Sequence, residues 1–76
     1  MTENTTSFAY TVAAFASEGE EKESVAVYGI LATSPHMAVE AVRQMMPRDV
    51  HVELAGTLSR KVARALRLKQ GEARRL

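Results

Sequence analysis

Four basic residues in the last third of the chain have the type and spacing that best fit a binding function. Arg60, Arg64 and Arg67 recur at i, i+4 and i+7, and Lys61 follows Arg60. On a helix this spacing places the three arginines along one face, where their guanidinium groups can pair with phosphates. The sequence therefore predicts a binding site for a partner or for nucleic acid at Arg60, Lys61, Arg64 and Arg67.

This basic row has a simpler explanation as a solvated helix face, because arginines near a helix carboxyl terminus interact favourably with the helix dipole. No aromatic residue interleaves with the arginines, so the stacking surface of single-strand binders is not predicted. The chain also lacks the first helix of a double-stranded-RNA-binding domain and the glycine loop of a KH domain. Direct nucleic-acid binding is therefore the second interpretation.

Residues for metal binding or catalysis are sparse. His36 and Glu40 are one helical turn apart and could approach an ion together, but only His51 could add a similar ligand, and a site needs three or four. The chain has no cysteine, no glycine-framed serine and no phosphate-binding loop. The acidic segment 18–23 lacks the spacing of a calcium loop and is predicted to be a turn. We predict no metal, no cofactor and no enzyme activity.

The elements that would position these residues follow the order β-β-α-β-α. Apolar patterning predicts strands over 7–17 and 24–33 that form a hairpin around the polar segment 18–23. Ser34 as N-cap and Pro35 in the first turn predict a helix over 34–46, which Pro47 ends. Its apolar arc is wide enough to predict contact with a second element besides the sheet.

The second half of the chain is predicted to add one strand and one helix. Residues 49–55 alternate, with Val50, Val52 and Leu54 directed inward. A helix should run over 58–70, with Thr57 as N-cap and Gly71 as its stop. Its apolar stripe consists of Leu58, Val62, Ala65 and Leu66. Residues 1–6 and 72–76 are expected to be flexible.

The predicted fold is a single small α+β domain with a three-stranded, mainly antiparallel sheet packed by two helices. The preferred strand order is 2-1-3, because a right-handed crossover then makes every neighbouring pair antiparallel. Strand 3 lying parallel beside strand 2 is the alternative. With 76 residues and no cysteine the core is small and has no disulfides, so oligomerisation would help to stabilise it.

Both faces of the first two strands are apolar, so two helices on one side would leave an apolar face open. Depending on how the hairpin is turned, this face holds either Phe8, Tyr10, Val12, Val25, Val27 and Leu31 or Ala13, Phe15, Ala26, Tyr28 and Ile30. The candidate interface residues are Tyr10, Val12, Phe15, Tyr28 and Ile30. We expect a homodimer or a partner protein there. The alternative places the helices on opposite faces.

Charge is segregated along the chain. Residues 1–47 hold two basic and six acidic residues, whereas residues 48–76 hold eight basic and three acidic ones. The longest uncharged apolar run, 25–32, is too short to span a membrane, and the absence of cysteine fits a reducing compartment, so a cytoplasmic location without membrane contact is expected.

From these features we predict a non-enzymatic interaction protein, an inhibitor or adaptor that docks on a protein or nucleoprotein complex through charged surfaces. Its size and segregated charge are similar to those of small phage-encoded or accessory inhibitors of bacterial nucleoprotein machines.

Overall fold

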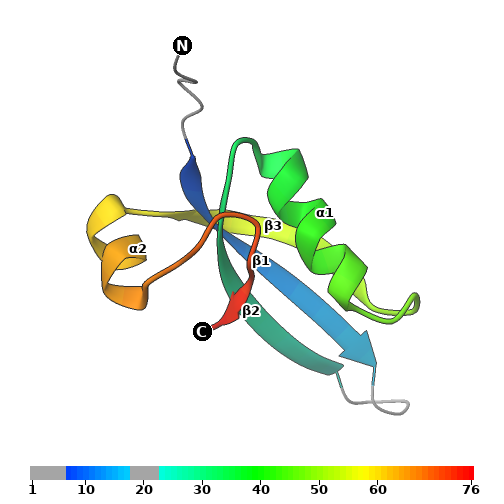
Figure 1. Cartoon of the computed structure of the whole chain (residues 1–76). Helices are drawn as coiled ribbons and strands as arrows, with labels where there is room; N and C mark the ends of the chain where they lie inside the picture. Colours follow the sequence, from blue (N-terminus) through cyan, green and yellow to red (C-terminus); the bar gives the residue numbers. More distant parts are fainter. Residues whose placement is uncertain (1–6, 18–22) are drawn as a thin grey trace.

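The computed structural model describes residues 7–17 and 23–76, so residues 1–6 and most of the predicted acidic turn lie outside it. The elements are β1 (Phe8–Ser17), β2 (Glu23–Ala32), α1 (Pro35–Met45), β3 (His51–Leu58), α2 (Arg60–Leu66) and β4 (Arg74–Arg75). All four strands form one antiparallel sheet of order β3-β1-β2-β4 (Figure 1). The α+β class is confirmed, whereas the predicted number of three strands is wrong by one.

The pairing of β1 with β2 decides which residues share a face of the sheet. Val12 lies opposite Tyr28 and Tyr10 lies opposite Ile30, so even-numbered residues of one strand meet even-numbered residues of the other. Facing residues project to the same side of a sheet. Each of the two predicted faces combined even-numbered residues of one strand with odd-numbered residues of the other. Both predicted faces are therefore wrong.

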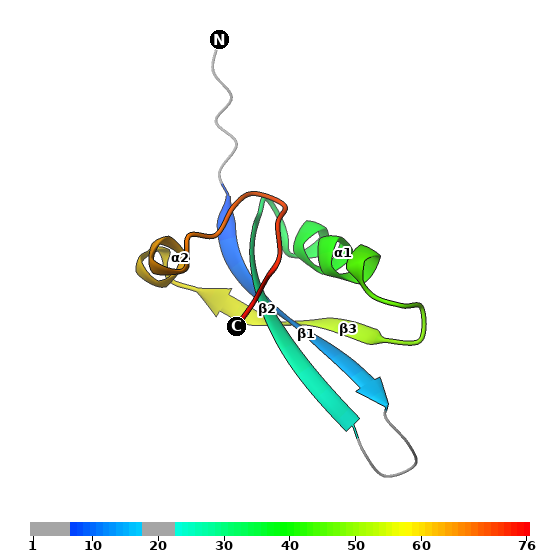
Figure 2. The same cartoon turned by 60° about the horizontal axis from the view of Figure 1, so that its bottom comes forward.

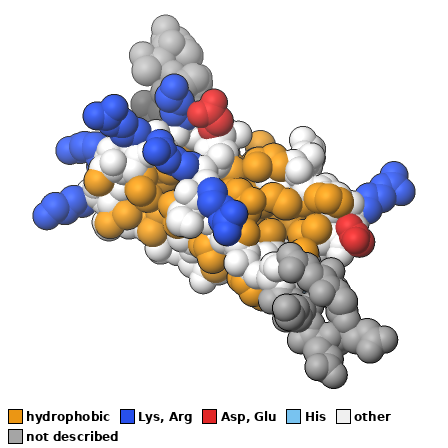
Figure 3. Space-filling model, turned by 90° about the horizontal axis from the view of Figure 1, so that it is seen from below, with side chains coloured by type: hydrophobic (Ala, Val, Ile, Leu, Met, Phe, Trp, Pro, Cys, Tyr) orange, Lys and Arg blue, Asp and Glu red, His pale blue; other side chains and the backbone are white. Residues whose placement is uncertain are grey.

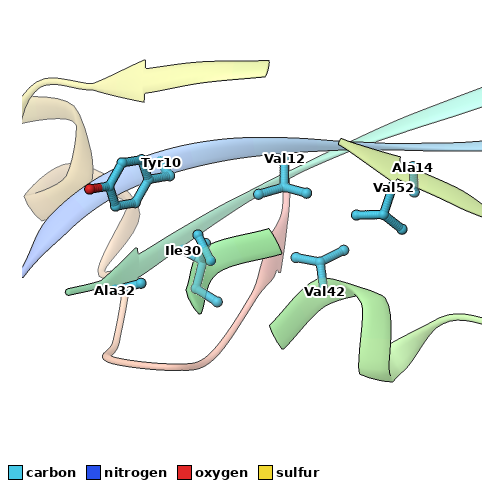
Figure 4. Close-up of a cluster of buried hydrophobic side chains, with 8 residues drawn as sticks. Tyr10, Val12, Ala14, Ile30, Ala32, Val42 and Val52 are labelled. Atoms are coloured by element: carbon cyan, nitrogen blue, oxygen red, sulfur yellow. The ribbon is translucent and has the colours of Figure 1, made fainter. Parts of the chain in front are cut away.

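Helix α1 covers the even-numbered face. Its predicted start is confirmed, because the Ser34 side chain accepts a hydrogen bond from the Met37 amide and Pro35 occupies the first turn. Ala38 and Val42 are fully buried in a cluster with side chains from β1, β2 and β3 (Figure 4). The cluster consists of Tyr10, Val12, Ala14, Ile30, Ala32, Ala38, Val42 and Val52.

Most of the remaining apolar arc of α1 is also packed, because Val39, Ala41 and Met46 are partly buried against the same cluster. Met37 is 54% exposed and Met45 is 51% exposed. Ala73, in the segment before β4, also packs against this cluster, and the contact of the arc with a second element besides the sheet stays a prediction.

Strand β3 is longer than predicted, and this shortens the second helix. β3 pairs with β1 as far as Leu58, which lies opposite Ala9. The helix consequently begins at Arg60, and Ser59 rather than Thr57 is its N-cap, because the Ser59 side chain accepts from the Val62 amide. The helix ends at Leu66, before Arg67 in the left-handed conformation, and not at Gly71.

The predicted apolar stripe of α2 is also corrected. Ala63, which was not in the stripe, is the buried residue of α2, while Val62 is 42% exposed and Ala65 is exposed. Figures 1 and 2 show α2 at one end of the sheet, apart from α1. A helix in this position needs only a narrow contact with the sheet, so most of its surface remains in solvent.

The segment expected to be a flexible tail contains β4. Arg74 and Arg75 pair with Gly29 and Tyr28, and the Leu76 amide donates to the Val27 carbonyl at 2.9 Å. Upstream, the Gly71 amide donates to the Leu31 carbonyl at 2.9 Å. The free edge of β2 offers backbone donors and acceptors, and the end of the chain satisfies part of them.

A β-bulge interrupts the pairing of β3 with β1. Thr11 lies opposite Gly56 and Val12 lies opposite Leu54, so Ala55 is an extra residue on β3. The predicted inward direction of Val52 is confirmed by its burial, but Leu54 is 40% exposed. The strict alternation expected along this strand ends at the bulge.

Replacing Val42 with Asp should unfold the domain. An unpaired carboxylate would enter the fully buried centre of the α1 cluster, which should remove at least about 3 kcal/mol of stability. Thermal unfolding followed by circular dichroism measures the effect, with Gln44→Asp at an exposed position of α1 as the control. A Val42→Asp protein that melts cooperatively within a few degrees of wild type would contradict the assigned core.

Candidate functional site

The predicted binding residues lie together at one end of the molecule. Arg60, Lys61 and Arg64 project from α2, and Arg67 follows as its C-cap. All four are exposed, and none forms an ion pair or a side-chain hydrogen bond within the described chain. Figure 3 shows Lys and Arg side chains gathered at one end of the molecule.

The local structure changes the shape of the predicted arginine row. Because Arg67 has φ 58° and ψ 46°, it leaves the helix, and only Arg60 and Arg64 remain on a helical face. The Arg67 amide bonds to the Arg64 carbonyl at 3.0 Å, and the Leu68 amide bonds to the Ala63 carbonyl at 3.2 Å. The turn closes the helix and leads the chain back to β2.

This return brings further cations to the same end. The Arg74 guanidinium donates to the Leu66 carbonyl at 3.0 Å, which connects β4 to the last turn of α2. Arg67, Lys69, Glu72 and Arg74 line a shallow depression. The sequence analysis expected Arg74 in a flexible tail, since a two-residue strand carries no periodic signal.

The basic end is defined here as residues 60–76, which hold seven basic residues and one acidic residue, Glu72. So many like charges in one short segment repel one another, and they create a positive potential that attracts an acidic partner. Solvent and salt screen this potential strongly, because the side chains are exposed.

An apolar pocket of about 360 Å³ adjoins the basic end. Its walls include Ala9 from β1, Leu31 from β2, Leu58 from β3 and Ala63 from α2. Arg60 and Tyr10 also line it. We call this cavity the α2 pocket. Arg60 and Tyr10 were each predicted as binding or interface residues, but the cavity was not predicted from the sequence, because it forms between the ends of four elements.

The comparisons with known proteins do not assign a family. No protein-family model matches the chain, and searches for similar curated proteins and solved structures also found no match. Within the described residues, neither helix is long and apolar enough to cross a membrane.

The histidines do not assemble a metal site. His36 is exposed, and Glu40 pairs with Arg43 at 2.6 Å. His51 and Glu53 both belong to the edge strand β3, and His51 Nε2 lies 2.9 Å from a Glu53 carboxylate oxygen. No group of three or more His, Asp or Glu side chains converges among residues 7–17 and 23–76.

The residues predicted as an apolar interface lie on both faces of the sheet. Val12 and Ile30 are fully buried and Tyr10 is 7% exposed, so these three belong to the core and not to a surface. Tyr28 packs against the same core. Phe15 is the member that lies on the other face, opposite the half-exposed Val25.

The odd-numbered face therefore carries the apolar surface of the sheet. Its β1 and β2 members are Ala9, Thr11, Ala13, Phe15, Val25, Val27, Gly29 and Leu31. Leu58, Leu68 and Leu76 approach Gly29 from this side, since each lies within 3.4 Å of where a Cβ on that residue would be. They cover one end of the face only, and Figure 3 shows hydrophobic side chains along the surface that remains.

We expect Arg64→Glu to leave the fold intact, because its side chain is exposed and unpaired. The free energy of unfolding should change by less than about 0.5 kcal/mol. Ala63→Glu, at the neighbouring buried position, should cost more than about 2 kcal/mol. Urea denaturation compares the two variants. Equal losses of stability would show that α2 does not turn its Ala63 side toward the sheet.

Proposed function

We propose that this protein is a non-enzymatic interaction domain whose basic end docks on an acidic surface of a protein or nucleoprotein complex. The observation that carries the proposal is the set of exposed, unpaired cations at Arg60, Lys61, Arg64 and Arg67. Unpaired like charges contribute little to folding, and their side chains are free to bind an external anion. An inhibitor or adaptor that binds a larger assembly would use such a surface.

Two features favour an acidic protein surface over a nucleic acid. First, the α2 pocket next to Arg60 is lined mainly by apolar side chains, which a phosphate backbone cannot use. Second, α2 has seven residues, or about 10 Å of helix, and no aromatic residue lies on it for base stacking. An acidic protein segment with apolar side chains can satisfy both parts of the surface.

The second candidate function is direct nucleic-acid binding by the same four residues. It is supported by the concentration of arginine and lysine at one end of the molecule. The two functions differ in their dependence on salt. On duplex DNA, the logarithm of the binding constant should fall with the logarithm of salt concentration by about 0.9 per neutralised phosphate.

Self-association through the odd-numbered face remains a proposal alongside docking at the basic end. The face is apolar around Phe15 and Val25, and α2 with the chain end covers only its other part. A second copy related by a twofold axis would cover this surface. The basic residues of α2 would stay accessible in such a dimer, because α2 lies at the opposite end of the sheet from Phe15 and Val25 (Figure 1).

Capture from a lysate of the native host tests the docking proposal. The wild-type chain should retain its partner after nuclease treatment, whereas an Arg60→Glu, Arg64→Glu double variant should capture at least about tenfold less, as expected for the loss of two charge contacts. Arg48→Glu, an exposed residue in the turn after α1, is the control. Loss of all captured material on nuclease treatment would favour the nucleic-acid function, and equal loss with Arg48→Glu would remove the role of the basic end.

Light scattering across protein concentrations tests self-association. If the odd-numbered face forms a dimer, Val25→Lys should raise its dissociation constant by about tenfold or more, because a charge would enter the interface. Met37→Lys, at a similarly exposed site on α1, should leave the constant unchanged. A wild-type chain that stays monomeric up to about 1 mM would contradict the dimer.

A further inference from the structure

The α2 pocket is lined by a polar group that is open to solvent and has no hydrogen-bond partner among the described residues. Tyr10 is 7% exposed, and its hydroxyl makes no hydrogen bond with any described residue. In Figure 4 this hydroxyl is the end of the side chain that points away from Val12 and Ile30, whereas the ring belongs to the core. Because Tyr10 also lines the α2 pocket, the hydroxyl is the part available to a bound molecule.

The pocket has the size and lining of a ligand site. Its volume of about 360 Å³ falls near the lower end of the range for such sites, which is roughly 300–1,000 Å³. Ala9 and Ala63 are small and buried, so their short side chains leave space between the sheet and α2. Such a space fits one large apolar side chain better than an extended ligand.

The polar groups around the pocket fit an anion. Arg60 lines the pocket and has no carboxylate partner among the described residues. The guanidinium of Arg60 and the hydroxyl of Tyr10 can both donate to one carboxylate. Thr57, an exposed residue of β3, adds a further hydroxyl to the lining.

We propose that the α2 pocket binds a short acidic segment of the partner protein, with one large apolar side chain inside the pocket and an adjacent carboxylate held by Arg60 and the Tyr10 hydroxyl. This inference rests on the proposed docking function and adds the type of segment that is recognised. Arg64 and Lys61 lie outside the pocket lining and attract further acidic residues of the segment. The apolar residue supplies specificity, and the charges supply the rate of encounter.

Fluorescence anisotropy with fluorescein-labelled octapeptides tests the inference on the full chain. One peptide consists of Asp and Glu with a central Phe, and its three relatives carry Ser in place of Phe, Gln in place of the acidic residues, or Lys in place of the acidic residues. The acidic peptide with Phe should bind at least about tenfold more tightly than each of the others, because only it supplies both the apolar group and the anion.

Protein variants then locate the binding. Tyr10→Phe keeps the ring and should weaken binding of the acidic Phe peptide about three- to tenfold, as expected for one lost hydrogen bond. Arg60→Gln should weaken it about tenfold. Arg48→Gln, in the exposed turn after α1 and outside the binding surface, should change it less than twofold. Thermal unfolding of each variant must match wild type for the comparison to count.

NMR of the wild-type chain locates the peptide residue by residue and needs no variant to fold. In two-dimensional NMR of the wild-type chain, the acidic Phe peptide should shift the amide signals of Ala9, Thr57 and Ala63. Shifts confined to Lys61 and Arg64, or equal affinity for the Phe and Ser peptides, would overturn the pocket while leaving the docking function standing. Absence of saturable binding below about 1 mM would also overturn it. Equal affinity for the Lys peptide would contradict both proposals.

Discussion

The antiparallel pairing of β1 with β2 is the interaction on which the rest of this structure depends. Ten residues of each strand are in register, from Phe8 opposite Ala32 to Ser17 opposite Glu23. This register places Val12 and Ile30 on one face, where α1 completes a core without buried charges. It also leaves two edges, and the two parts of the basic end are attached there. β3 leads into α2, and β4 holds the chain end beside β2.

The basic end is energetically unusual for such a small domain. Its cations have little to gain from one another, and burial of Ala63 together with the contact of Leu68 near Gly29 anchors the segment to the sheet. The hydrogen bond from Arg74 to the Leu66 carbonyl adds one tie between β4 and α2. Ala63, one of these anchoring residues, also lines the cavity to which Tyr10 contributes. Stability and surface chemistry are therefore coupled at this end of the sheet.

Sequence patterns were sufficient where a local signal had one physical outcome. Ser34 followed by Pro35 began a helix as expected, and the antiparallel neighbours of β1 were predicted correctly. Sequence patterns failed where pairing between distant strands decided the bounds of an element. The last helix lost its first turn because β3 continues to Leu58, and β4 is too short to show alternation. With apolar residues on both faces of the hairpin, alternation could not choose the register, so Val12 and Ile30 were predicted to lie at an interface.

The β-bulge in β3 has a consequence for how copies of this protein meet in concentrated solution. β3 forms one outer edge of the sheet, and its free backbone groups could pair with another strand. The extra residue, Ala55, breaks the regular spacing of those groups and increases the local twist. Only a short regular stretch remains on each side of the bulge. The irregular edge therefore offers a poor template for edge-to-edge aggregation, although the strand also exposes Leu54.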